Sequence, residues 1–231
     1  MTTTLITGAN KGLGLQTARR LIAEGHTVYL GARDARRGQG AADLLGARLL
    51  LIDVIDDDSV DAAASKVREQ VGHLDVLVNN AGIAAPRRAP GDVTGSDIQG
   101  VYDTNVFGVV RVMHAFLPLL EASDAAVVVN VSSGMGSLTI TTDPERFEST
   151  LPSLAYSSSK SAVNMLTSQY AKAYPTLRIN AVDPGYTATD LNGHRGTQSV
   201  EEGAEIIVQM ATIGADGPTG GFFASNGPVP W

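Results

Sequence analysis

The 231-residue sequence has no cysteine, few aromatic residues and no long hydrophobic run, and each absence excludes a class of protein. Without cysteine the chain forms no disulfide and offers neither a thiolate metal ligand nor a cysteine nucleophile. No apolar run is long enough to span a bilayer, and the first residues lack the basic start of a signal peptide. We therefore expect a cytoplasmic protein with no membrane partner.

Positive charge is also scarce, since 17 Lys and Arg face 24 Asp and Glu. The formal net charge of -7 gives no reason to expect a nucleic-acid partner. The hydrophobic fraction of 43% suits a sizeable core, and no linker-like segment interrupts the chain, so we predict one domain over residues 1–231. No metal site is predicted, because metal-ligand spacing is absent among His26, His73, His114 and His194.

Short segments rich in Val, Ile and Leu alternate with segments of helical length, a pattern typical of a parallel sheet buried on both faces. The predicted strands are Thr4–Thr7, Thr27–Ala32, Arg48–Asp53, Val76–Asn79, Ala125–Ser132, Arg178–Asp183 and Gly221–Ala224. The predicted helices are Leu13–Glu24, Asp56–Val71, Ser96–Glu121, Ala155–Ala173 and Val200–Met210, with caps at Asp56, Ser96 and Ser199. Right-handed crossovers then give an α/β fold, a single doubly wound Rossmann-type sheet of about seven strands with helices on both faces.

A glycine-rich turn follows the first predicted strand, with the sequence Gly8-Ala9-Asn10-Lys11-Gly12-Leu13-Gly14. The three glycines let the backbone turn sharply and come close to a pyrophosphate, while the following helix offers free N–H groups at its start. No Gly-Lys-Ser or Gly-Lys-Thr closes the turn, so the pattern favours a dinucleotide over ATP.

The end of the second predicted strand bears on which dinucleotide is bound. Ala32 stands where an acid would accept the ribose hydroxyls of NAD, and Arg33 follows it. A guanidinium can bind the extra phosphate of NADP, and Lys11 can add a second positive charge. Asp34 is the counter-argument, because its side chain could turn inward and accept a ribose hydroxyl. We predict NADP(H) as the cofactor, with NAD as the alternative.

Tyr156 and Lys160 are spaced to share one face of a helix. A nearby ammonium favours the phenolate and lowers the pKa of a tyrosine from its usual value of about 10, and a cationic nicotinamide would add to that effect. The pair is therefore a candidate acid-base centre. Two unrelated residues on a helix surface can have the same spacing, so the rest of the chain has to decide between the two interpretations.

Taken together, these segments resemble the short-chain dehydrogenase/reductase family, and its carbonyl-reductase branch in particular. The similarity rests on the glycine-rich turn, on the stretch from Ala32 to Gln39, and on the ending Gly221-Phe222-Phe223 with Val229-Pro230-Trp231. It extends over essentially the whole chain. The resemblance implies a dinucleotide-binding oxidoreductase that reduces a ketone, aldehyde or quinone carbonyl with NADPH.

The resemblance also implies four catalytic residues. Tyr156 would be the general acid, and Lys160 would lower its pKa and bind the nicotinamide ribose. Ser133, the second serine of the pair at the end of the fifth predicted strand, would polarise the substrate carbonyl, and Ser132 would face away from it. Asn105 would hold a water that links Lys160 to solvent. Taken without the resemblance, Asn105 is explained equally well as a residue bonded within its own helix.

Cofactor contacts are implied at the ends of the predicted strands. Pro184-Gly185 would pass the nicotinamide, Thr187 would bond its carboxamide, and Asp53 would bond the adenine, although Asp53 also suits a helix start. Asn79 would mainly brace the sheet. The full predicted set of cofactor-binding residues is Gly8, Asn10, Lys11, Gly12, Leu13, Gly14, Arg33, Asp53, Val54, Asn79, Ala81, Gly82, Tyr156, Lys160, Pro184, Gly185, Thr187 and Thr189.

The segment between Ser133 and Tyr156 is longer than in most family members, with an insertion around Leu138–Leu151 that includes Asp143–Glu148 and predicts a short polar helix. In the carbonyl-reductase branch such an insertion covers a surface that other members use for tetramers, so we predict a monomer, with a dimer as the alternative. The short loop Leu191–Ser199 predicts an open site. Two other functions stay open: an NADP(H)-binding sensor without turnover, and an NAD-dependent alcohol dehydrogenase.

Overall fold

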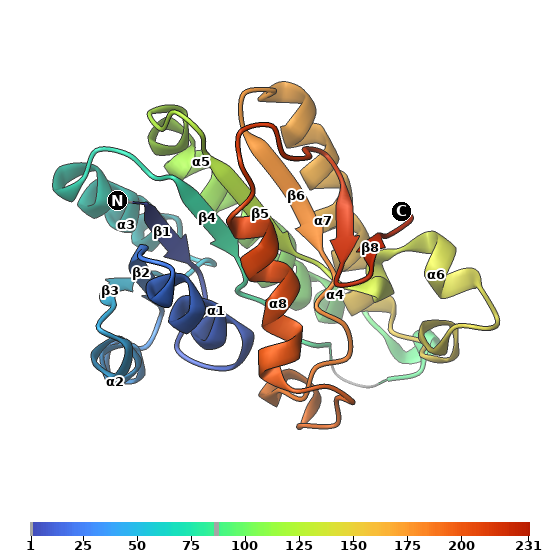
Figure 1. The fold of residues 1–231 in the computed structure, drawn as a ribbon. Helices are drawn as coiled ribbons and strands as arrows, with labels where there is room; N and C mark the ends of the chain where they lie inside the picture. The colour runs from blue at the N-terminus through green and yellow to red at the C-terminus, as the bar shows by residue number, and fades with distance from the viewer. Residues whose placement is uncertain (1, 86–87) are drawn as a thin grey trace.

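The computed structural model describes residues 2–85 and 88–231. Within this part of the chain, eight strands form one sheet in the order β3-β2-β1-β4-β5-β6-β7-β8 (Figure 1). All neighbours pair in parallel except the short β8, which runs antiparallel to β7. The strands are β1 (Thr3–Ile6), β2 (Thr27–Ala32), β3 (Arg48–Leu51), β4 (Val76–Asn79), β5 (Val127–Val131), β6 (Arg178–Val182), β7 (Phe222–Ala224) and β8 (Gly227–Pro228). The predicted doubly wound α/β sheet is confirmed.

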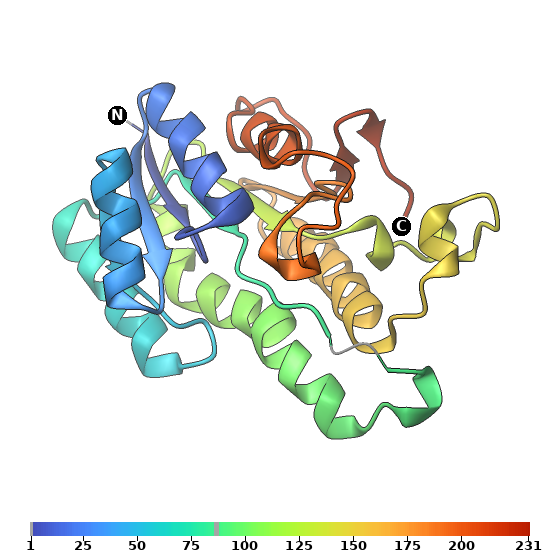
Figure 2. The same ribbon diagram turned by 90° about the horizontal axis from the view of Figure 1, so that it is seen from below.

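Helices cover both faces of the sheet (Figure 2). One face carries α1 (Gly12–Ala23), α2 (Ala35–Leu45) and α8 (Val200–Ala211), and the other carries α3 (Asp57–Gln70), α4 (Gly95–Tyr102), α5 (Gly108–Glu121) and α7 (Leu154–Ala173). The shorter elements are η1 (Pro90–Asp92), η2 (Asp103–Phe107), η3 (Gly134–Gly136), α6 (Leu138–Thr142), η4 (Phe147–Thr150) and η5 (Asp190–Asn192). In the part of the chain that the structure describes, no helix combines the length and apolarity needed to cross a bilayer.

The central strands are apolar on both sides because each side has its own core. Successive residues alternate between the two, so that Leu77 packs under α3 and α5 whereas Val78 packs under α1 and α8. Burying one such side chain stabilises the fold by about 1.5–3 kcal/mol. The two cores hold the strands in fixed register, and this aligns the ends of β1, β4, β5 and β6 along one edge.

The helix α2 was missing from the sequence-based prediction. Its segment contains two glycines and is polar, so it gives a weak helical signal. Asp34 nevertheless caps it by accepting a hydrogen bond from the Arg37 N–H, and Gly38 lets it pack tightly on the sheet, since a Cβ there would lie 2.7 Å from Leu49. Close packing and a cap thus compensate for poor propensity.

Three further predictions are corrected by the structure, while the caps Asp56 and Ser199 are confirmed. The cap at Ser96 is wrong, because Thr94 caps α4 in a capping box with Asp97. The single helix over Ser96–Glu121 is interrupted by the π-helical turn η2. The short polar helix predicted in the insertion forms only as α6, which ends at Asp143, whose carboxylate accepts a hydrogen bond from the Glu145 N–H, and η4 follows.

Candidate active site

The glycine-rich turn after β1 has the backbone conformation that its glycines predict. Gly8 and Gly12 have φ angles of 63° and 54°, in the region that side chains disfavour. A Cβ on Gly14 would lie 2.6 Å from the Asn80 Nδ2 and 2.8 Å from the Gly8 carbonyl oxygen. The turn is therefore closed so tightly that no larger residue fits at Gly14.

The start of α1 is open to an anion. Lys11 is its N-cap residue but provides no side-chain hydrogen bond to the first N–H groups, which leaves them for an outside acceptor. The Lys11 ammonium instead forms an exposed ion pair with Asp190, at 2.7 Å, from the loop after β6. Thr189 lies next to the turn, its Cγ2 being 3.7 Å from where a Gly12 Cβ would stand. This geometry suits a dinucleotide pyrophosphate.

Asn80 braces this turn with its side chain. Its Nδ2 donates to the carbonyl oxygens of Thr7 at 2.8 Å and Gly8 at 3.1 Å. The Thr7 hydroxyl accepts in return from the backbone N–H groups of Asn80 and Ala81, both at 3.0 Å. The end of β4 and the predicted cofactor residue Ala81 are thereby fixed against the turn. The doubled asparagine in Asn79-Asn80 was the available signal.

Arg33 lies at the end of β2 as predicted, exposed, and it forms no hydrogen bond or ion pair with any residue in 2–85 or 88–231. Asp34 does not turn inward. Its carboxylate accepts from the backbone N–H of Arg37 at 2.9 Å and from the Arg37 Nε at 3.0 Å. The backbone hydrogen bond is the largest cause that keeps the pKa of Asp34 below its usual value. The charge that could oppose an extra phosphate is thus engaged at the start of α2.

The predicted adenine residues follow β3. The Asp53 carboxylate accepts from the Ile55 N–H at 3.3 Å, while the backbone N–H of Asp53 donates to the Ser59 hydroxyl at 2.9 Å. Val54 is buried against Gly108, and a Cβ added to Gly108 would lie 2.9 Å from the Val54 side chain. Asp53 therefore shapes a local turn, and its position beyond β3 is the one that the prediction requires.

Tyr156 and Lys160 lie on one face of α7, with the Lys160 Nζ 5.7 Å from the centre of the Tyr156 ring. The ammonium donates to the Val131 carbonyl oxygen at 2.7 Å, at the end of β5. Lys160 is only 6% exposed, and burial lowers its pKa to about 8. A buried lysine that can lose its charge near neutral pH is unusual for a structural residue.

The pKa of Tyr156 differs from the prediction. Burial raises it to about 12, and a hydrogen bond with the Ser133 side chain opposes part of that rise, whereas Asp183 adds to it. Lys160 is not among the causes that shift the pKa of Tyr156, and the pKa of Lys160 is itself lowered by burial. The predicted lowering of the Tyr156 pKa is therefore not a property of this pair alone.

The two serines after β5 point in different directions, as strand alternation predicts. The Ser132 hydroxyl is buried and donates to the Asn164 Oδ1 at 2.6 Å. Ser133 is only half-buried; its hydroxyl accepts from the Met135 N–H at 3.2 Å and bonds with Tyr156. Of the pair, Ser133 is the serine that lies beside Tyr156.

Asn105 lies in the π-helical turn η2 and is 1% exposed. Its Nδ2 donates to the Ile83 carbonyl oxygen at 3.0 Å and to the Ser159 hydroxyl at 3.1 Å, and its Oδ1 accepts from the Ile83 N–H at 2.8 Å. A Cβ on Gly82 would lie 3.5 Å from the Asn105 Oδ1 and 3.7 Å from the Lys160 Nζ. The side chains of Asn105 and Lys160 thus both approach Gly82. π-helical turns such as η2 are frequent at functional sites.

Asn79 links β4 to β5, in keeping with its predicted bracing role. Its Nδ2 donates to the Asn130 Oδ1 at 2.9 Å, and the Asn130 Nδ2 donates to the Thr167 hydroxyl of α7, also at 2.9 Å. The buried Asn79 Oδ1 has no hydrogen-bond partner among the described residues. This network places α7 relative to the strand ends.

The turn after β6 is held by Gln198, a residue that was not predicted to take part in the site. The Gln198 Nε2 donates to the Pro184 carbonyl oxygen and, at 2.9 Å, to the Thr187 hydroxyl. Gly185 has a φ of 73°, and its N–H donates to the Asp183 Oδ1 at 3.0 Å. The three residues predicted to meet the nicotinamide therefore form one braced turn at the same edge as Ser133.

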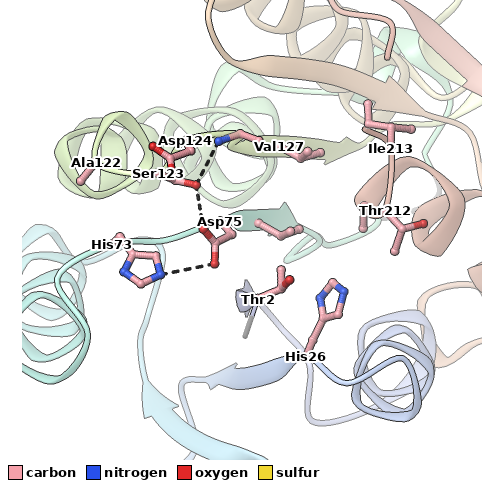
Figure 3. Close-up of a pocket in the computed structure, with 13 residues that line it drawn as sticks. Thr2, His26, His73, Asp75, Ala122, Ser123, Asp124, Val127, Thr212 and Ile213 are labelled. Atoms are coloured by element: carbon pink, nitrogen blue, oxygen red, sulfur yellow. Dashed lines mark hydrogen bonds and ion pairs between the residues drawn. The ribbon is translucent and has the colours of Figure 1, made fainter. Parts of the chain in front are cut away.

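The opposite edge of the sheet holds a cavity of about 460 Å³ (Figure 3). His26, His73, Asp75 and Ser123 line it, and Asp75 accepts from the Ser123 hydroxyl at 2.7 Å. Among residues 2–85 and 88–231, no three His, Cys, Asp or Glu side chains gather as a metal site. None of the residues predicted to act on a substrate or cofactor lines this cavity.

Comparison with known proteins gives one consistent result. A family model described as short chain dehydrogenase matches residues 2–199. Short-chain dehydrogenase anuI of Penicillium roqueforti is 38% identical over 224 residues, covering 91% of this chain and 88% of that protein. The (+)-neomenthol dehydrogenase of Arabidopsis thaliana is 34% identical and covers 95% of each chain. The crystal structure of NADPH-bound carbonyl reductase from chicken fatty liver has a TM-score of 0.89 at 28% identity, covering 100% of this chain and 99% of that one.

Proposed function

The chain belongs to the short-chain dehydrogenase family of oxidoreductases, and from this membership we propose that it is an NADPH-dependent carbonyl reductase. The observation that carries the proposal is the convergence of Ser133, Tyr156 and Lys160 at the end of β5. A hydroxyl, a phenol and a buried ammonium at one strand end are the groups that polarising and protonating a carbonyl oxygen requires. Similarity to reductases, including an NADPH-bound carbonyl reductase, supports the same function.

In this proposal the bound nicotinamide cofactor supplies the hydride, and the chain supplies position and protons. Tyr156 donates its phenolic proton to the oxygen of the reduced carbonyl. Ser133 donates a hydrogen bond to that oxygen, so that the negative charge developing there is stabilised. Lys160 holds a positive charge beside the phenol and favours the phenolate after proton transfer. Asn105 fixes the backbone at Ile83 next to the ammonium.

The preference for NADPH is proposed from the end of β2. Arg33 is exposed and unpaired there within the described residues, while the nearest carboxylate, Asp34, is engaged by Arg37. A free guanidinium binds a phosphate through two hydrogen bonds, whereas NAD offers only ribose hydroxyls at that position. Lys11 contributes a second positive charge if Asp190 releases it.

The test is consumption of NADPH and of NADH with a panel of quinones, dicarbonyls, aromatic ketones and aldehydes. For the wild type we expect a higher kcat/KM for NADPH than for NADH. Arg33→Asp should lower kcat/KM for NADPH by about 10- to 100-fold, as expected for losing a charged hydrogen bond, and spare NADH. Arg36→Asp, an exposed charge-matched control, should change the ratio little. Equal use of both cofactors by the wild type would contradict the assignment, and NADPH binding without any turnover would favour a sensor.

A further inference from the structure

Asp183 is a half-buried carboxylate at the end of β6 that the proposed mechanism does not use. It lies just before the Pro184-Gly185 turn, and its Oδ1 accepts from the Gly185 N–H at 3.0 Å. Its other oxygen, Oδ2, would lie 3.0 Å from a Cβ on Gly134, which follows the neighbouring strand β5. The Gly134 N–H also donates to this carboxylate. One side chain therefore connects two turns.

The two turns carry different parts of the candidate site. Gly134 directly follows Ser133 and begins η3, which packs against α7 so closely that a Cβ on Gly136 would lie 2.7 Å from the Lys160 backbone. Pro184 and Gly185 belong to the turn predicted to pass the nicotinamide. Asp183 thus stands between the residue that would polarise the substrate and the turn that would hold the cofactor.

The charged groups around Asp183 come from two elements. Tyr156 and Lys160 belong to α7, and the charge of Asp183 acts to raise the pKa of both. Glu148 of η4 approaches from the insertion; its Oε1 would lie 3.3 Å from a Cβ on Gly134, the same point that Asp183 faces. Arg146 pairs with Glu148 at 3.5 Å and opposes its effect. The insertion therefore brings its own acid to the edge of the site.

We propose that Asp183 is a positioning residue, whose carboxylate ties the Ser133 turn to the Pro184-Gly185 turn and whose negative charge acts on Lys160, with Glu148 of the insertion setting how much of that charge is present. The catalytic role of Asp183 rests on the proposed function, whereas the contacts that Asp183 makes do not depend on it. Asp183 touches neither substrate nor cofactor in this inference and acts through the residues it holds.

The electrostatic part has a definite sign. Burial is the main cause that raises the pKa of Asp183, and Glu148 raises it further, so the carboxyl ionises later than an ordinary aspartate. Once ionised, it raises the pKa of Lys160 against the lowering effect of burial. Removing the charge should consequently lower the pKa of Lys160 further, whereas removing Glu148 should leave Asp183 ionised over a wider pH range.

The first experiment follows Lys160 by NMR in protein labelled with ¹³C at the lysine ε-carbons, titrated through its pKa and assigned with Lys160→Met. Asp183→Asn should lower the pKa of Lys160 by about one unit, the size expected of one nearby charge in a partly buried site. Asp124→Asn, at the opposite edge of the sheet, is the matched control and should leave it unchanged. Lys11, Lys66 and Lys172 report any general change in the same spectra.

The second experiment measures the pH profile of kcat/KM for the carbonyl that the wild type reduces. Asp183→Asn should move the profile to lower pH, and Asp183→Ala should also reduce kcat by about tenfold or more, because both turns lose their connection. Glu148→Gln should keep kcat and leave the pKa of Lys160 at or slightly above its wild-type value.

The proposal is overturned if Asp183→Asn leaves both the Lys160 titration and the pH profile in place, even when its melting temperature falls, since that pattern indicates a purely structural residue. Failure of the proposed function looks different. In that case no carbonyl is reduced by the wild type, while the Lys160 titration still responds to Asp183→Asn.

Discussion

The two edges of the sheet hold similar side chains in different ways. At the edge where β1, β4, β5 and β6 end, Lys160 is 6% exposed and its pKa is lowered to about 8, while Asn105 lies in a π-helical turn. At the other edge the His73 and Asp75 side chains remain 38% and 24% exposed, and they pair at 3.4 Å beside a water-accessible cavity (Figure 3). Polar residues gather at both edges, but it is the first that buries an ammonium group almost completely.

The hydrogen bonds at the two edges also have different roles. Asp75 accepts from the Thr3 N–H and from the Ser123 hydroxyl, both at 2.7 Å, and so joins the starts of β1 and β4 to the segment before β5. At the opposite edge, the Lys160 ammonium has three N–H donors, and its one hydrogen-bond acceptor among the described residues is the Val131 carbonyl oxygen. Asp75 therefore uses its oxygens to hold elements of the fold together, whereas the Lys160 ammonium has donors left for a ligand. The size of a cavity alone does not distinguish these two arrangements.

The largest effect at the first edge is expected from Tyr156→Phe. We expect a loss of kcat of about 100- to 10,000-fold, because the general acid is removed while the ring and its packing remain. NADPH binding, measured by fluorescence, should persist. Tyr170→Phe on the same helix is the control. The Tyr170 ring stacks on Tyr174 away from the site, so the loss of its hydroxyl should leave kcat unchanged. Near-normal turnover of Tyr156→Phe would remove the proposed role.

Local spacing made much of the site predictable. The glycine-rich turn and the pair Tyr156 and Lys160 are each contained in one short segment, so their geometry follows from a tight turn and from the period of a helix. The edge at which they meet follows from the parallel order of the strands. Family membership and fold were accordingly predicted from sequence and are confirmed.

What the sequence could not provide depends on burial and on contacts between distant segments. The spacing of Tyr156 and Lys160 reveals the nearby ammonium but not the desolvation that raises the pKa of Tyr156 in the chain without cofactor, and the lowering expected with a cationic nicotinamide stays a prediction. Gln198 bonds to residues 11 and 14 positions before it, and Asp183 accepts from the Gly134 N–H of another segment, contacts that no local pattern encodes. The assignment of roles to individual site residues remains a prediction that the experiments above address.

A smaller effect is expected at the opposite edge from Asp75→Asn. The amide keeps one acceptor oxygen and loses the other, so either Thr3 or Ser123 loses its partner. The free energy of unfolding in urea should fall by about 1–2 kcal/mol, the usual cost of such a loss, while kcat/KM stays at its wild-type value. Asp124→Asn, an exposed neighbour in the same cavity, controls for charge removal. A large drop in kcat/KM without loss of stability would assign this edge a part in catalysis.

The smallest expected effect concerns His26, whose Nδ1 lies 2.8 Å from the Thr4 hydroxyl. Burial is the largest cause that lowers the pKa of His26 in the folded chain, against smaller opposing effects of Glu24 and Asp75. Above its unfolded pKa of about 6.5 the ring is neutral in both states and adds no pH dependence. As the pH falls below that value the unfolded chain takes up the proton first, so the free energy of unfolding decreases until the folded pKa is passed. His26→Gln should flatten this slope without changing kcat, whereas an unchanged slope would show that the ring titrates alike in both states.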